Sequence, residues 1–161
     1  MIEKYQLIQN HPLFISNLKK LQELEADRVF CRHTMEHFLD VARLMYIYTL
    51  TEQTGLSRDQ IYGAALLHDL GRVMQIEKGT PHDLASVLLA GEILPDCGYR
   101  DSEVKEIQDA IGHHRLKEAG EGSLLSLYLQ KADKESRICF LCPVREECNW
   151  PEYRKNSVLK L

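Results

Sequence analysis

AALLHDLGR, residues 64–72, is the stretch of this sequence that decides its fold. Ile61 and His68 lie seven residues apart, with small apolar residues between them, so they share one face of a helix. Ser57, followed three residues later by Gln60, forms the capping-box pattern that starts such a helix. The glycine before the last residue of the stretch is expected to end it. The segment therefore predicts a buried helix whose end carries a histidine and an aspartate.

Outward from this helix, apolar residues at helical spacing predict five more helices. They cover residues 12–27, 34–54, 80–94, 102–114 and 123–135. No segment shows the alternation and turn signals of strands. The sequence therefore predicts an all-α fold class with a single helical domain over residues 1–137, N-terminal helix included. Residues 138–161 are expected to form an irregular, cysteine-rich tail packed on that domain.

Composition limits the classes of function. The 161 residues are 44% hydrophobic and 27% charged, which is typical of a globular domain, and the net charge is −4. There is no block of basic residues, which disfavours broad nucleic-acid binding. No signal peptide and no apolar stretch of membrane-spanning length is present, so we expect a cytoplasmic protein with no membrane partner.

Histidines and aspartates recur beside the apolar faces of the predicted helices. They are His37, His68, Asp69, His82, His114 and Asp133, with His113 preceding His114. A buried carboxylate is costly unless it is paired or binds a metal, and several imidazoles would compensate two aspartates poorly without a cation. The pattern predicts a metal site with mixed nitrogen and oxygen ligands, a set that suits Fe, Mn, Zn or Co. The adjacent pair His113-His114 leaves open whether one, both or neither is a ligand.

Four short sequence motifs resemble those of a known protein family. They are HFLDVAR at 37–43, AALLHDLGR at 64–72, AIGHHR at 110–115 and LQKADKESR at 129–137. Together they resemble the HD superfamily of metal-dependent phosphohydrolases, over about two-thirds of the chain. The resemblance implies a helical bundle, a metal-activated water, and cleavage of a phosphoester or phosphoanhydride. A nucleotide or similar small phosphorylated metabolite is the expected substrate, and a homodimer is allowed.

The resemblance also implies a ligand set for two divalent ions, with Fe or Mn expected. The first ion would take His37, His68, Asp69 and Asp133, and the second would take Asp69, His82, His113 and His114. Asp69 would bridge the two ions, which places it in the catalytic centre.

Arg72 is the one departure from the family pattern, because many phosphohydrolases of this family have lysine there. Arg72 lies one turn after His68, and a guanidinium binds phosphate well. We therefore predict a catalytic and substrate-binding role for Arg72. Further candidates for substrate binding are His33, Arg115 and Lys134.

Two other functions fit the same residues. Some HD proteins use a mixed-valence di-iron pair as an oxygenase that cleaves a C–C or C–P bond, and they share most of these ligands. The cysteines also suggest a non-catalytic sensor of metal or redox state, although the full ligand set argues against that role.

A second constellation follows the last helix. Cys139, Cys142 and Cys148 lie within ten residues, and the first pair has metal-ligand spacing. Cys31 precedes the helix of His37, which must meet the helix of Asp133, so it is the expected fourth ligand. A structural zinc ion is predicted, with an iron–sulfur cluster as the alternative for the same ligands.

Overall fold

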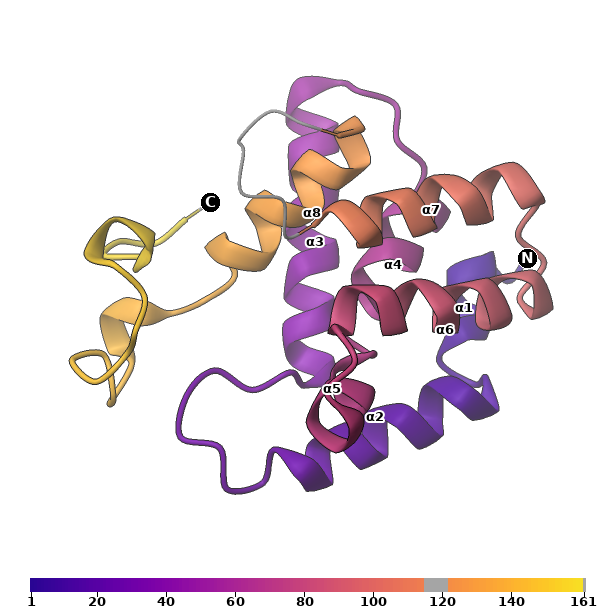
Figure 1. Cartoon of the computed structure of the whole chain (residues 1–161). Coiled ribbons are helices and arrows are strands. Elements are labelled where there is room, and N and C mark those ends of the chain that lie inside the picture. The colour runs from indigo at the N-terminus through magenta and orange to yellow at the C-terminus, as the bar shows by residue number, and fades with distance from the viewer. Residues whose placement is uncertain (115–121, 161) are drawn as a thin grey trace.

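A computed structural model describes residues 1–114 and 122–160 of the chain. The described residues form eight α-helices and two short 3-10 helices (Figure 1). The α-helices are α1 (Lys4–Ile8), α2 (Pro12–Leu24), α3 (Met35–Glu52), α4 (Arg58–Leu67), α5 (Arg72–Lys78), α6 (His82–Asp96), α7 (Asp101–His113) and α8 (Leu124–Glu135). The 3-10 helices are η1 (Cys139–Leu141) and η2 (Glu152–Arg154). No strand occurs in these residues, so the all-α, single-domain prediction is confirmed.

Helix α4 is the centre of the bundle. It packs against α1, α3, α6, α7 and α8. The capping box of Ser57 and Gln60 is present at its start, and the face predicted from Ile61 is buried. This central position places the residues that follow α4, His68 and Asp69, where α3, α6, α7 and α8 converge.

The core that surrounds α4 is assembled from the inward faces of its neighbours. Its fully buried side chains include Phe38, Met45, Leu67, Ile107 and Leu129. Burial of a large apolar side chain contributes roughly 1.5–3 kcal/mol, so this cluster is the main source of stability around the site. The polar residues discussed below are therefore held on rigid elements.

Gly71 allows two segments of the backbone to approach each other closely. A Cβ at this position would lie 2.4 Å from the carbonyl oxygen of His82 and 2.4 Å from the amide nitrogen of Ser86. The Gly71 amide also donates a hydrogen bond of 2.8 Å to Oγ of Ser86. Only glycine fits here, because the atoms in the way are backbone atoms that cannot move independently. This contact brings the start of α6, and with it His82, against the end of α4.

Three helices differ from the sequence prediction. The short α1 was not predicted, and α5 begins at Arg72, where we expected only a chain break after Gly71. Helix α6 also continues through Pro95 to Asp96 instead of stopping at Pro95. Proline is tolerated there because it lies in the last turn, where only one backbone hydrogen bond is lost.

The segment after α8 is irregular, as expected, and lies beside the loop that joins α2 to α3 (Figure 1). The side-chain amide of Asn156 donates to the carbonyl oxygens of Lys134 and Arg137, each at 2.8 Å, and ties the tail to the end of α8. The division at residue 137 stays a prediction. Among the described residues, no helix is both long enough and apolar enough to cross a membrane.

Candidate metal centre

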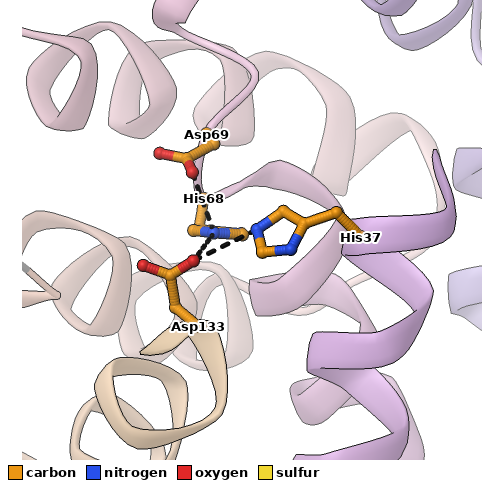
Figure 2. Close-up of side chains that lie close together, drawn as sticks. All are labelled: His37, His68, Asp69 and Asp133. Carbon is orange, nitrogen blue, oxygen red and sulfur yellow. Dashed lines mark hydrogen bonds and ion pairs between the residues drawn. The ribbon is translucent and has the colours of Figure 1, made fainter. Parts of the chain in front are cut away.

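The first ligand group joins residues from three places in the bundle. His37 comes from α3, His68 and Asp69 from the end of α4, and Asp133 from α8 (Figure 2). One ligand atom from each residue lies within 4.8 Å of all the others. Nε2 of His68 is 3.2 Å from Oδ2 of Asp69 and 3.5 Å from Oδ1 of Asp133. Nε2 of His37 is 3.1 Å from the same Asp133 oxygen. The four side chains therefore point at one common position.

A second group shares Asp69 with the first. Oδ1 of Asp69 lies 3.1 Å from Nε2 of His82 and 3.7 Å from Nε2 of His114. The two imidazole nitrogens are 3.3 Å apart, and all three residues are buried. The two oxygens of one carboxylate thus face two different groups. This is the geometry that a bridging carboxylate needs.

The histidine rings are oriented by hydrogen bonds on their far sides. Nδ1 of His68 faces the carbonyl oxygen of Ala65 at 2.8 Å, and Nδ1 of His114 faces the carbonyl oxygen of Ile111. A carbonyl can only accept, so each Nδ1 carries a proton, and Nε2 is the nitrogen of each ring that is placed to bind a metal ion. Such outer hydrogen bonds are typical of metal-binding histidines.

His82 and His37 are held in a similar way by side chains. Nδ1 of His82 lies 3.1 Å from Oε1 of Gln75, which is on α5, and Nδ1 of His37 lies 3.3 Å from Oγ of Ser136. Gln75 was not identified from the sequence, because α5 itself was not predicted. Its contact gives this short helix a role in positioning the second group.

The charges at the centre are suited to a bound cation. Burial would lower the pKa of His68, but the carboxylates of Asp69 and Asp133 outweigh it and raise the pKa to about 10. Burial would raise the pKa of Asp69, yet the neighbouring histidines hold it well below its usual range. Although Nε2 of His68 is close to two carboxylates, its geometry makes no hydrogen bond, which leaves a fully buried nitrogen without such a partner. A divalent ion bound between these groups would balance both carboxylates and leave His68 neutral, so the residues fit a metal.

The pKa of His37 shifts in the opposite direction to that of His68. Burial lowers the pKa of His37 to about 4, with Arg137 and His68 adding to the effect and Asp133 opposing it. Nη2 of Arg137 lies 3.2 Å from Nε2 of His37. At neutral pH the His37 imidazole is therefore uncharged, which is the form that binds metal.

A cavity of about 410 Å³ opens onto both groups. Five of the side chains lining it are cationic: Arg28, Arg72, Lys134, Arg137 and Arg154. Two aromatic side chains, Phe30 and Trp150, line it as well. The chain as a whole carries a net charge of −4, so this local excess of positive side chains marks the cavity as a place for an anion. We refer to it as the cleft.

The substrate-binding residues predicted from the sequence lie in different surroundings. Arg72 and Lys134 line the cleft, and Nε of Arg72 lies 3.8 Å from Oδ1 of Asp69. His33 also lines it but is buried, with Nδ1 2.7 Å from Glu25 and Nε2 3.4 Å from Asp69. His33 is therefore held beside the metal ligands by a buried glutamate. Arg115 lies outside the described residues.

His113 does not join the second group. Its side chain is exposed, and Nδ1 faces the carbonyl oxygen of Asp109 at 2.6 Å. It lines a separate surface hollow between α6 and α7. Neighbouring residues of a helix point about 100° apart, so only one of the pair can face the centre. His114 faces it, and the structure places His113, which the predicted ligand set included, outside the second group.

Several lining residues were missed by the sequence analysis. Arg137 is one helical turn beyond Asp133, so the spacing argument that identified Arg72 beyond His68 would also have identified Arg137. Arg28 and Arg154 come from irregular segments, for which periodicity offers no signal. The four cysteines of the predicted second site lie around a neighbouring cavity of about 510 Å³.

Comparison with known proteins adds a family to this geometry. The HD domain family matches residues 34–142, which include all residues of both ligand groups. A protein of Clostridium beijerinckii, described as uncharacterized, is 38% identical over 155 residues, covering 96% of this chain and 97% of its own length. A crystal structure described as a predicted HD superfamily hydrolase from an uncultured Thermotogales bacterium has a TM-score of 0.64 at 24% identity. That match covers 96% of this chain and 87% of the solved one, and it supports the fold.

Proposed function

We propose, from the premise that this chain belongs to the HD domain family, that it is a metal-dependent phosphohydrolase. Its substrate is a nucleotide or a similar small phosphorylated metabolite. The observation that carries the proposal is the Asp69 carboxylate, whose two oxygens face two separate ligand groups at the bottom of a cationic cleft. Two ligand groups that share a carboxylate are suited to a pair of divalent ions, and a phosphate ester is the substrate class on which such pairs commonly act.

The ligands divide between two ions. His37, His68, Asp69 and Asp133 would hold the first, and Asp69, His82 and His114 would hold the second. When bound, such ions supply a water molecule of lowered pKa and positive charge for the developing negative charge on phosphorus. The mixed nitrogen and oxygen ligands suit Fe or Mn, which remain our expectation for the native metals.

The protein's own side chains would position the substrate. The guanidinium of Arg72 lines the cleft beside Asp69, where it can bind two oxygens of one phosphate. Arg28 and Arg154 line the same cleft and can bind further phosphates of a longer substrate. The cations therefore favour a substrate with more than one negative charge.

The aromatic residues support a nucleotide over a simple phosphate ester. Trp150 is the chain's single tryptophan, and it lines the cleft together with Phe30. Aromatic side chains stack on nucleobases, and such stacking contributes about 1–3 kcal/mol per base. A substrate with phosphates at the ligand groups and a base against Trp150 would use both parts of the cleft.

A substrate screen tests the proposal. Metal-free protein is reloaded with Mn²⁺ or Fe²⁺ without oxygen and incubated with mononucleotides, linear dinucleoside polyphosphates and cyclic dinucleotides. We expect hydrolysis of at least one class, with one ¹⁸O atom from labelled water in the product phosphate. The Asp69→Ala variant serves as the control for contaminating phosphatases.

The same experiment separates the two alternative functions. Consumption of dissolved oxygen by the iron-loaded protein, with no hydrolysis, would identify the di-iron oxygenase instead. Full metal content with no turnover of any substrate would favour the sensor.

A further inference from the structure

Four cysteines form a second cluster beside the cleft; their cofactor can be tested without the proposed function, whereas their effect on substrate binding rests on it. Cys31 lies in the loop between α2 and α3, whereas Cys139, Cys142 and Cys148 lie beyond α8. All four line the same cavity, of about 510 Å³, between that loop and the tail. Burial raises the pKa of the Cys31 thiol, Arg137 opposes the change, and the other three cysteines raise the pKa further. The four thiols are therefore electrostatic neighbours, although more than a hundred residues of chain separate the first from the others.

Apolar packing alone does not explain how the tail is held against the helical bundle. From residue 138 to residue 160, only Cys139, Lys155 and Asn156 are buried. Its large apolar side chains, such as Leu141 and Tyr153, are exposed at 75% and 84%. Burial of apolar surface thus contributes little to holding this segment against the bundle. Thiolate–metal bonds can supply that stability, because metal binding by a segment without its own core is coupled to its folding.

The spacing of the sulfur atoms distinguishes between the two cofactors that the sequence suggested. A tetrahedral zinc ion with Zn–S bonds of about 2.3 Å would bring its four sulfur atoms to about 3.8 Å from one another. Within residues 1–114 and 122–160, no three cysteine sulfur atoms lie within 4.8 Å of one another, whereas the histidine and aspartate ligands do. In a [4Fe–4S] cluster each of the four thiolates binds a different iron atom, so the cysteine sulfur atoms stand further apart than around one zinc ion.

We propose that Cys31, Cys139, Cys142 and Cys148 bind an iron–sulfur cluster that fastens the tail to the loop between α2 and α3. This replaces zinc as the expected occupant, while the four predicted ligands stay the same.

The cluster site shares a wall with the cleft. Cys31, Arg137, Cys148 and Trp150 line both cavities. The backbone amide of Trp150 also donates to Sγ of Cys148 at 3.5 Å. A cluster bound to Cys148 would therefore fix the position of Trp150 against the substrate. We assign the cluster a positioning role, in which its loss affects substrate binding more than the chemical step.

The test uses the full chain purified without oxygen. We expect acid-labile sulfide in equal amount to the cluster iron, and an absorbance band near 400 nm that bleaches with dithionite. Sulfide is the decisive quantity, because the histidine and aspartate groups can bind iron but contribute no sulfide. Zinc in place of sulfide in protein expressed with ample iron would overturn the cluster assignment.

Single variants test the ligand set. Cys31→Ser and Cys142→Ser should each lose the sulfide and lower the melting temperature, while Cys97→Ala, which alters a buried cysteine outside this cavity, should keep both. Circular dichroism establishes that each variant is helical. Sulfide content equal to the wild type in folded Cys31→Ser protein would overturn the four-cysteine site. If a hydrolysed substrate is known, Cys142→Ser should raise its KM several-fold with a smaller change in kcat, and an unchanged KM would overturn the positioning role.

Discussion

Oδ1 of Asp69 lies 3.1 Å from Nε2 of His82, while Oδ2 of the same carboxylate lies 3.2 Å from Nε2 of His68. One side chain thereby connects two groups of ligands that come from different helices. The connection depends on Gly71, whose missing Cβ lets the start of α6 lie against the end of α4.

Asp69→Ala should remove both metals together. The carboxylate serves both groups, so its loss leaves three ligands in the first group and two in the second. We expect metal content to fall at both positions and hydrolysis to fall to the rate seen without added metal. Metal analysis and circular dichroism of the same sample give the result. Two retained ions in the variant would exclude the bridging role.

His114→Ala and His113→Ala should differ, although the residues are adjacent. His114 is buried with Nε2 facing Asp69, whereas His113 is exposed on the other side of the helix. We expect His114→Ala to lose one of the two ions and most of the activity. His113→Ala is the matched control and should keep both. Equal metal loss in the two variants would contradict the assignment of His114, and not His113, to the second ligand group.

Arg72→Ala should reduce activity without affecting metal content. The side chain lines the cleft but belongs to neither ligand group. A hydrogen bond to a charged group contributes about 1.5–3 kcal/mol, so we expect kcat/KM to fall roughly ten- to hundredfold. Arg43→Ala, on the exposed side of α3, is the control. Unchanged kinetics with the hydrolysed substrate would remove Arg72 from the site.

The metal-free protein should lose stability as the pH rises above neutrality. The carboxylates of Asp69 and Asp133 raise the pKa of its His68 to about 10, compared with the ordinary histidine value of 6.5. Stability from this proton is fully present below pH 6.5 and is lost as the pH approaches 10, by at most about 1.4 kcal/mol per pH unit. Urea unfolding at pH 7, 8 and 9 measures the slope, and His68→Gln identifies the part due to this residue.

The metal-loaded protein should lack that slope, because a metal ion replaces the proton on His68. Loading the metal-free protein at pH 7 should accordingly release protons, which calorimetry in buffers of different ionisation enthalpy detects. A difference between wild type and His68→Gln that does not change with pH would contradict the assigned charge state.

Helix periodicity predicted most of the fold because the long helices are amphipathic. The start of α4 was predictable from Ser57 and Gln60, since capping is a local interaction. Helix α5 is too short to show a periodic face, and the stop expected at Pro95 failed because proline is acceptable in a final turn. Two adjacent histidines offer the same ligand chemistry, so residue type alone could not show whether His113 or His114 faces the centre. The spacing from Ile107 and Ile111 favoured His114. Arg28 and Trp150 in the cleft lie outside the helices, in segments whose position depends on tertiary contacts.

Metal analysis combined with anomalous scattering tests the central claim most directly. Protein purified without oxygen should contain two ions in the histidine and aspartate centre, a few ångströms apart, with Asp69 bound to both. One ion should contact His37, His68 and Asp133, and the other should contact His82 and His114. A single fully occupied ion, with His82 and His114 unligated in protein supplied with excess Fe²⁺ or Mn²⁺, would contradict the two-metal account.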